Sequence, residues 1–486
     1  MTIIAEKCIE RQMNLLDAEE WREHNPAVKG TDVFDSDTGK VREKWLSDCA
    51  EERVLTSRLL TEVAELSNLE KACRKVVSNG GCAGVDGMTT GRLSEWFDCN
   101  WKKLREESIT GVYQPRPVLE VSIPKSSGGK RLLGIPTAKD RLVQQAIQQV
   151  LMPRYEKVFS DYSYGFRPNR SAHGALRTAG AYVKDGRDWI IDIDLEKFFD
   201  NVNQQRLMWL LSRRIGDKQL LRLIHKMLKS GILRGGLVSQ RISGTPQGGP
   251  LSPLLSNIVL DELDKELERR GHTFVRYADD LRIMVGSREA ALRVMDGVTG
   301  YIESRLRLKV NRDKSRVCRA WETNFLGHGL NLDGTLFLSK ESEKRFRDKV
   351  REITKRRRGI SLEVLISELN VKLRGWLYYF RYARMKNRLR DLSSWLRHRI
   401  RCFRLKQCKR VIGMVRFLRK RKVPEWRCWI LALSGKGWWR LSAAPQAHEA
   451  MDKRWFEEIG LFNLQGNYEQ LKLGETAVYQ QVRTVV

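Results

Sequence analysis

The sequence lacks the signatures of several common classes of protein. It has nine cysteines in 486 residues without a C-x-x-C pair, and its seven histidines are scattered, so neither a zinc site nor a disulfide framework is indicated. The N-terminal stretch carries charges throughout and has no apolar core of a signal peptide, and no apolar run is long enough to span a bilayer. We therefore expect a cytoplasmic protein with no membrane partner.

Positive charge, in contrast, is abundant. The formal net charge is +30, and residues 341–420 alone hold 18 Arg and 8 Lys against 7 acidic residues, a net +19. Such a run can be a solvated helix face, but nineteen uncompensated charges would repel one another without a polyanion nearby. Nucleic acid is the expected partner.

The chain divides into two kinds of segment. After a polar extension over residues 1–55, short β-like stretches alternate with helical ones up to about residue 335. A single helix is expected from Thr56 to the glycines at 80–81, because Leu59, Val63 and Leu66 recur at helical spacing. Beyond residue 340 the strands stop and the sequence is helical, basic and aromatic. The pattern predicts an α+β body followed by an all-helical basic module.

Two adjacent acids interrupt an otherwise apolar stretch, F-V-R-Y-A-D-D-L-R-I-M-V at 274–285. The simplest interpretation is a β-hairpin whose tip is Ala278-Asp279-Asp280. Neighbouring carboxylates raise each other's pKa unless a cation offsets them, so a divalent metal is attractive there. An ordinary Asp-rich turn is the alternative.

A second acidic strand occurs upstream, in W-I-I-D-I-D-L-E-K-F-F-D at 189–200. Alternation places Ile191 and Ile193 on one face, with Asp192 and Asp194 on the other. If Asp194 lies beside the hairpin tip, three carboxylates can hold two Mg²⁺ ions, the arrangement that serves nucleotidyl transfer.

Seven sequence blocks in order resemble the reverse transcriptases of bacterial group II introns, the intron-encoded maturase family. They are LGIPTAKDRLVQQAI, SYGFRPNRSAHGAL, IDIDLEKFFDNV, GTPQGGPLSPLLSNI, RYADDLRIMV, KVNRDKS and FLGH. The resemblance implies a right-hand polymerase followed by a basic all-helical maturase domain. Fingers and palm would span 56–335, the thumb and maturase (X) domain 336–430, and a basic, DNA-binding-like segment 431–486.

The resemblance also implies roles for individual residues. Asp194, Asp279 and Asp280 match the catalytic acids that bind two Mg²⁺ ions. Phe199 matches the aromatic residue that screens the 2′ position of the incoming sugar, with a core aromatic as the alternative. Lys314 is expected to help protonate the leaving pyrophosphate, although a loop lysine is usually just solvated.

Three further residues match the nucleotide-binding parts of the family. Lys125 and Arg131 flank a Gly128-Gly129 turn that can deliver cations to a triphosphate, or they belong to an exposed basic hairpin. Gln247 matches the nucleotide pocket, and the alternative is a simple turn before the next helix. All three are expected to bind substrate.

RNA contacts are expected in the basic module. In the helical stretch 391–404 an apolar stripe of Leu392, Leu396, Ile400 and Phe403 faces inward. Another face carries arginines that would bind RNA phosphates, namely Arg390, Arg397, Arg401 and Arg404.

The predicted function is an RNA-directed DNA polymerase that binds its group II intron RNA, assists its splicing and copies it into DNA during retrohoming. Intron RNA, target DNA and dNTPs are its expected partners, a homodimer is left open, and on DNA the protein would associate with the bacterial nucleoid. With no H-N-H signature we expect no endonuclease, so the primer would come from elsewhere, for example a replication fork. The alternatives are an intron-free reverse transcriptase used in DNA repair or phage defence, and an RNA-binding splicing factor with a vestigial polymerase.

Overall fold

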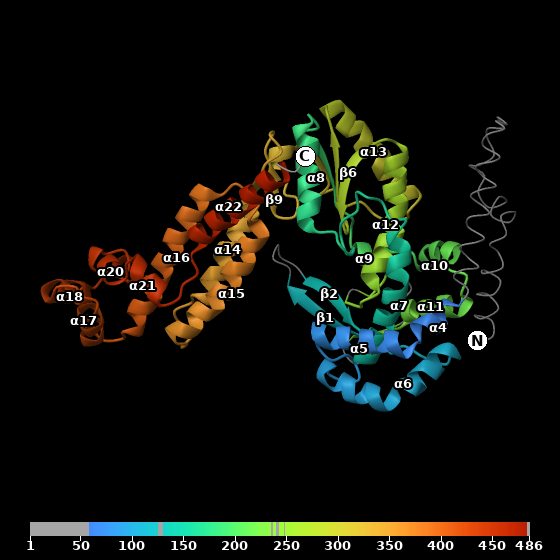
Figure 1. Cartoon of the computed structure of the whole chain (residues 1–486), viewed down its shortest axis with the longest axis horizontal. Coiled ribbons are helices and arrows are strands. Elements are labelled where there is room, and N and C mark those ends of the chain that lie inside the picture. Colours follow the sequence, from blue (N-terminus) through green and yellow to red (C-terminus); the bar gives the residue numbers. More distant parts are fainter. Residues whose placement is uncertain (1–57, 125–129, 235–236, 240–242, 247, 484–486) are drawn as a thin grey trace.

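The computed structural model describes residues 58–124, 130–234, 237–239, 243–246 and 248–483. They form a mixed α/β body and a helical arm that extends from it (Figure 1). This confirms the expected α+β body followed by a helical module. In the described part of the chain, no helix combines the length and the apolar character that a membrane span needs.

A four-stranded antiparallel sheet, here called the palm sheet, forms the centre of the body. Its strand order is β6-β7-β3-β8, and its strands are β3 (Trp189–Ile193), β6 (Thr273–Tyr277), β7 (Asp280–Val285) and β8 (Arg316–Arg319). Alternating apolar side chains cover both faces: Ile191 and Ile193 join one hydrophobic cluster, and Ile190 joins another. Helix α13 (Arg288–Ser304) contributes to the first cluster and α8 (Ala172–Lys184) to the second, so the sheet is buried on both sides.

The second sheet of the body also has four strands. Its order is β2-β1-β4-β5, with strands β1 (Val118–Pro124), β2 (Lys130–Ile135), β4 (Ile232–Arg234) and β5 (Leu237–Ser239). β1 and β2 pair antiparallel, whereas β1 and β4 pair parallel. The two strands expected from the sequence around residues 117–136 are confirmed.

Helices pack around both sheets of the body. The remaining ones are α4 (Leu59–Val63), α5 (Leu66–Asn79), η2 (Thr90–Arg92), α6 (Leu93–Ile109), α7 (Ala138–Glu156), α9 (Phe198–Asn201), α10 (Gln204–Arg214), α11 (Lys218–Lys229), α12 (Ser252–Arg269) and η3 (Ala320–Glu322). The single helix expected from Thr56 is wrong. Its described part is two helices, because Glu65 has an extended backbone, and the break leaves Leu66 exposed at the start of α5.

A short hairpin and nine helices continue the described chain into the arm. They are β9 (His328–Leu330), β10 (Leu336–Leu338), α14 (Lys340–Ile353), α15 (Leu362–Phe380), α16 (Lys386–Gln407), α17 (Val411–Lys420), α18 (Glu425–Ala432), α19 (Trp438–Leu441), α20 (Pro445–Ala450), α21 (Lys453–Glu458) and α22 (Leu464–Arg483). The predicted inward stripe of α16 is buried. One hydrophobic cluster joins α15 and α16 with Met451 and Trp455, so described residues of the expected segment 431–486 share a core with these two helices.

Candidate active site

The tip of the β6–β7 hairpin carries the paired acids, as the sequence predicts. Tyr277 lies opposite Asp280, and Ala278 turns the chain with a φ of 59°. Gly165 lies against this turn, where a Cβ atom would come within 2.2 Å of the Ala278 amide nitrogen. Only glycine fits, which gives a structural role to the S-Y-G-F-R block.

A buried polar network holds the hairpin tip in place. The Arg276 guanidinium donates to Asp264 Oδ1 at 2.7 Å, to Asn257 Oδ1 at 3.0 Å and to the Ala278 carbonyl at 2.9 Å. Asn257 in turn donates to the Gly165 carbonyl at 2.9 Å. Sequence reasoning missed this network, although an arginine in the apolar strand F-V-R-Y, which would need a buried partner, was the available signal.

The end of β3 brings Asp194 to the same edge of the palm sheet. Ile193 lies opposite Leu281, so Asp194 and Asp280 are neighbours on adjacent strands. The N-R-D-K-S block supports this end: Ser315 Oγ accepts from the Asp194 amide at 3.0 Å. Lys314 Nζ lies 3.8 Å from Asp194 Oδ2, which brings the predicted Lys314 to the site, while its catalytic role stays a prediction.

Asp280 contacts a cationic side chain that was not predicted from the sequence. Its Oδ1 lies 2.5 Å from Arg282 Nη1, and the same nitrogen lies 2.7 Å from Asp192 Oδ1. Burial raises the pKa of Asp280 to about 6, Arg282 opposes this rise, and the charges of Asp192 and Asp279 add to it. Burial likewise raises the pKa of Asp192. The strand position of Asp192 was visible in the sequence, but its shared cation was not.

The segment before α12 packs against the backbone at Phe199. The Thr245 amide donates to the Phe199 carbonyl at 2.7 Å, and the Phe199 ring packs edge-on against Phe198. A Cβ at Gly249 would lie 2.1 Å from Gln144 Oε1, a buried oxygen without a recorded partner. Gln144 was missed because it is one of four glutamines in α7, and nothing in the sequence distinguishes it from the others. The contacts of Phe199 with Thr245 and Phe198 are compatible with both of its predicted roles, as the residue that screens the sugar and as a core aromatic residue.

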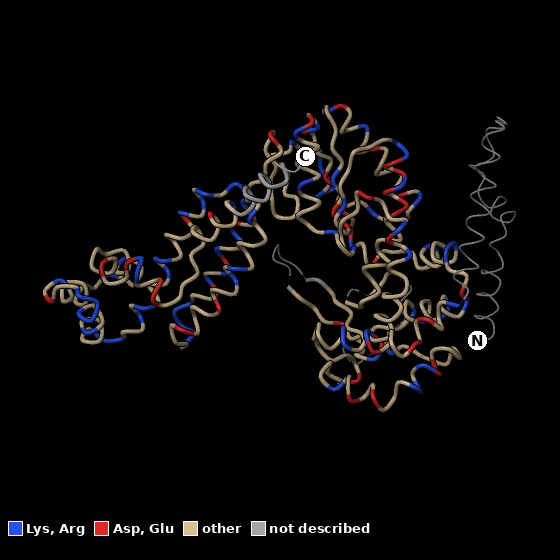
Figure 2. Tube along the Cα trace, viewed as in Figure 1, with Lys and Arg blue, Asp and Glu red and all other residues tan. Residues whose placement is uncertain are grey.

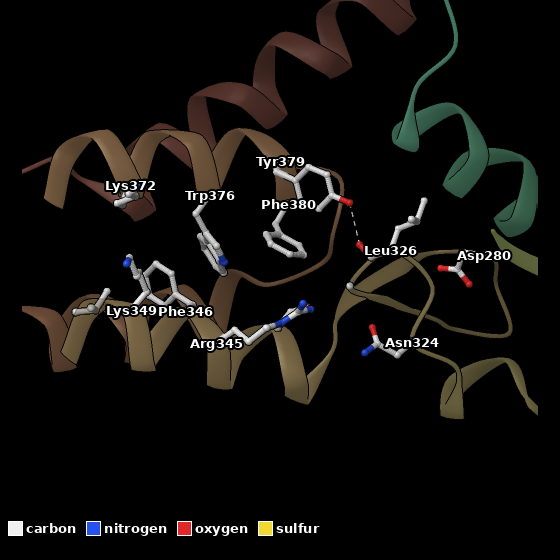
Figure 3. Close-up of a pocket in the computed structure, with 13 residues that line it drawn as sticks. Asp280, Asn324, Leu326, Arg345, Phe346, Lys349, Lys372, Trp376, Tyr379 and Phe380 are labelled. Carbon is white, nitrogen blue, oxygen red and sulfur yellow. Dashed lines mark hydrogen bonds between the residues drawn. The ribbon is translucent and has the colours of Figure 1, made fainter. Parts of the chain in front are cut away.

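A pocket of about 640 Å³ lies where the palm meets the arm. Asp280 and Asn324 line it on the palm side, and Arg345, Lys349 and Trp376 line it on α14 and α15 (Figure 3). Tyr379 Oη donates to the Leu326 carbonyl at 3.0 Å across this junction. The pocket combines an aromatic floor with a basic wall next to the acidic hairpin.

Comparisons with known proteins agree with this geometry. Residues 123–330 match the model of reverse transcriptase (RNA-dependent DNA polymerase), and residues 343–423 match that of the group II intron, maturase-specific domain. The chain belongs to the group II intron reverse transcriptase/maturase family. It therefore carries an RNA-directed DNA polymerase domain.

Three relatives of this group II family chain illustrate how far the similarity extends. Protein YkfC of Escherichia coli (strain K12) is 35% identical over 315 residues, which cover 56% of this chain and 82% of YkfC. Group II intron-encoded protein LtrA of Lactococcus lactis subsp. cremoris is 30% identical over 392 residues, 67% of this chain and 62% of LtrA. Retron Mx65 reverse transcriptase of Myxococcus xanthus is 28% identical over 63% of this chain and 72% of that protein. The chain thus spans less than two thirds of LtrA.

Polymerases of this family generally use divalent metal ions. Asp279 is exposed and Asp194 is half-buried, so both offer accessible carboxylate oxygens, the ligands that Mg²⁺ prefers. Asp280 faces Arg282 instead. Among the residues that the structure describes, no three acidic, thiol or imidazole groups converge in a way that could hold a metal. The donor chemistry of Asp194 and Asp279 fits Mg²⁺, and the three-carboxylate site with two ions stays a prediction.

Three residues predicted to bind the nucleotide lie outside the described residues or are described only by their backbone. Lys125 and Gln247 lie outside the described residues. Arg131 is described only by its backbone position in β2, where it pairs with Ile123 of β1. The substrate-binding roles of these three residues stay predictions.

The predicted arginine surface of α16 is wrong at one position. Arg401 is 6% exposed, its Nε donates to the Met451 carbonyl at 3.0 Å, and its guanidinium lies over the Phe456 ring. Burial lowers its pKa to about 10. The turn between α20 and α21 covers this part of α16, so Arg401 stabilises the fold and does not face a ligand.

The other members of the predicted surface differ in exposure. Arg390 is exposed, whereas Arg397 and Arg404 are half-buried. The Arg404 guanidinium lies 4.3 Å from the centre of the Phe417 ring. RNA binding by these three arginines stays a prediction, with Arg390 the most accessible of them.

Proposed function

We propose that this protein is an RNA-directed DNA polymerase that binds its group II intron RNA, assists its splicing and copies it into DNA during retrohoming. The observation that carries the proposal is the adjacency of the Asp194 strand end and the Asp279-Asp280 hairpin tip on the palm sheet, beside a basic pocket at the arm. A buried ion-paired network fixes that tip, as catalysis by positioned carboxylates requires.

In this proposal Asp194 and Asp279 hold two Mg²⁺ ions, with Asp280 as the third acid. The bound ions would activate the primer 3′-hydroxyl and neutralise the charge on the leaving pyrophosphate. Phe199 screens the 2′ position of the incoming sugar, and the cations Lys125 and Arg131 bind the triphosphate.

The remaining residues act on the incoming nucleotide and on the nucleic acid. Gln247 lines the nucleotide pocket, and Lys314 protonates the pyrophosphate. Arg345, Lys349 and Lys372 line the pocket at the palm–arm junction, where they can neutralise backbone phosphates of the template–primer duplex (Figure 3). Splicing chemistry would belong to the RNA, and protein binding would stabilise its folded state.

The decisive test is extension of a DNA primer on an RNA template in the presence of Mg²⁺. We expect the wild-type chain to extend the primer and Asp194→Asn to lose extension. Asp185→Asn is the matched control, since Asp185 is an exposed acid at the end of α8 that precedes β3, whereas Asp194 follows the other end of that strand. No extension by the wild type, or equal loss in both variants, would reject the proposed activity.

The alternative function is an intron-free reverse transcriptase in DNA repair or phage defence. The similarity to the retron Mx65 enzyme favours it, whereas the match to the maturase-specific domain favours the intron function. Tight and specific binding of a group II intron transcript encoded around the reading frame would support the intron function. The absence of any such ribozyme beside the gene would favour the alternative.

A further inference from the structure

The outer face of α18 is apolar although it points to solvent. Cys428, Leu431 and Ala432 face inward and join the hydrophobic core of the arm. Four large apolar side chains lie on the opposite side and are exposed to solvent. They are Trp426 (67% exposed), Trp429 (37%), Ile430 (55%) and Leu433 (68%). Large apolar side chains that gather on a solvent-exposed face often mark an interaction site.

These four side chains form one stripe, here called the α18 face. Their spacing of three, four and seven residues places them on the same side of the helix. The helix lies at the far end of the arm from the palm sheet (Figure 1), so the face is separate from the candidate active site. It also lies beyond residue 423, where the match to the maturase-specific model ends.

The surroundings of the α18 face are strongly basic. Residues 409–422, which include α17 and lead directly into α18, contain seven Lys and Arg and no acidic residue (Figure 2). Arg419 pairs with Glu425, and Arg421 pairs with Glu458. Exposed cations that belong to no recorded ion pair among the described residues are Lys409, Arg410, Arg416, Lys420 and Lys422.

The exposed cations and indole rings together indicate which kind of partner binds the α18 face. Two copies of the face would bring identical basic surfaces together, which Coulomb repulsion disfavours. A regular RNA duplex would satisfy the cations but leave the tryptophans in water, because its bases are stacked inside. Unpaired nucleotides satisfy both, since their phosphates meet Lys and Arg while their bases stack on aromatic rings.

We infer that the α18 face binds unpaired nucleotides in a loop or bulge of a structured RNA. The inference rests on the proposed function and deepens it, because it assigns to the arm a site that recognises exposed bases in addition to backbone phosphates. Trp426 and Trp429 supply the stacking surfaces, and the cations of residues 409–422 hold the adjoining backbone.

The test compares two RNA probes and two double variants in the full chain. One probe is a labelled hairpin with a loop of unpaired nucleotides, and the other is a blunt RNA duplex with the same number of phosphates. Trp426→Leu with Trp429→Leu keeps an apolar face but removes the rings, whereas Trp426→Phe with Trp429→Phe keeps aromatic rings. Circular dichroism and thermal melting check that both variants fold.

We expect the wild type to prefer the hairpin and the leucine variant to bind the hairpin about tenfold or more weakly. Its duplex affinity and the salt dependence of binding should stay unchanged, since no charge is removed. The phenylalanine variant should keep most of the preference. Trp321→Leu is the matched control, because Trp321 is an exposed indole in the body, 44% accessible.

Each other outcome is decisive. Unchanged hairpin binding by the leucine variant, equal loss for hairpin and duplex, or equal binding of both probes by the wild type would overturn the α18 inference alone. A dimer that the leucine variant abolishes would identify a second copy as the occupant and would also overturn it. If the wild type bound neither probe, the proposed binding of structured RNA would itself fall.

Discussion

Arginines in the palm and in the arm occupy opposite environments. Side chains of Arg276 and Arg282 in the palm sheet are 1% and 5% exposed, and each contacts an acid. In the arm, residues 341–420 carry a net charge of +19, and residues such as Arg390 face solvent. Palm arginines therefore hold carboxylates in place within the fold, whereas most arm cations need a partner from outside. Arg401 is an arm residue that is buried like the palm group, although its hydrogen-bond partner is the Met451 carbonyl.

The largest expected effect is a loss of polymerisation that leaves RNA binding intact, which would show that the palm and the arm have separate functions. Asp279→Asn removes a carboxylate at the hairpin tip, where metal-assisted stabilisation of transition-state charge is worth several kcal/mol, so polymerisation should fall by about a thousandfold or more. RNA binding should stay nearly intact, because it depends on the arm. Primer extension and RNA filter binding measure the two properties, and equal loss of both would contradict the division.

Stability should depend most on the buried arginine of the palm. Arg276→Gln leaves Asp264 buried without its cation, which should lower the free energy of unfolding by about 3–5 kcal/mol. Urea unfolding measures this. Arg269→Gln is the control, because its guanidinium is largely exposed and pairs with Glu266 on the same helix, so the loss should be far smaller than for Arg276→Gln.

A paired substitution sharpens this result. Arg276→Met together with Asp264→Leu removes both charges and should recover much of the lost stability, since no buried charge is left unpaired. If the double variant were as unstable as Arg276→Gln, then the hydrogen bonds to Asn257 and Ala278, and not the ion pair, would hold the hairpin tip.

The sequence predicts features of this molecule that depend on local periodicity. Alternation in β3 separates Ile191 and Ile193 from Asp192, and helical spacing identifies the inward stripe of α16, because a side chain's direction follows directly from the backbone repeat. The hairpin at Ala278 is predicted for the same reason. The order of the seven motifs identified the polymerase family, which periodicity alone could not indicate.

Features that depend on tertiary contacts could not be predicted in this way. Arg282 lies two residues beyond the hairpin tip, but only the strand register shows that it contacts both Asp280 and Asp192. Likewise a helical wheel groups Arg401 with Arg397 without showing that the α20–α21 turn covers Arg401. The split between α4 and α5 depends on one extended residue, Glu65, which no periodic pattern marks.

A buried acid of the body should make stability depend on pH. Burial, reinforced by the charge of Asp264, raises the pKa of Asp261 from 3.8 to about 6. Its folded pKa is above its unfolded one, so ionisation destabilises the fold as pH rises from about 4 to 6. Asp261→Asn should therefore stabilise the protein above pH 6 by about 1–3 kcal/mol.

The gain from Asp261→Asn should disappear as pH falls from 6 to 4, where the wild-type carboxyl is neutral in the folded protein. Urea unfolding at both ends of this range measures it, and Asp185→Asn should show no such trend. A gain that persists at pH 4 would mean that the substitution acts through packing instead of charge.

The smallest expected effects distinguish two arginines of the same helix. Arg390→Gln removes an exposed charge, so it should weaken RNA binding and lower the salt slope by about one unit if one phosphate contact is lost. Arg401→Gln removes a buried donor to Met451, so it should cost about 1–3 kcal/mol of stability and leave the salt slope unchanged. Salt titrations of RNA binding and urea unfolding, applied to both variants, measure these effects. The opposite assignment, with Arg401 setting the slope and Arg390 the stability, would show that α20 and α21 leave α16 when RNA binds.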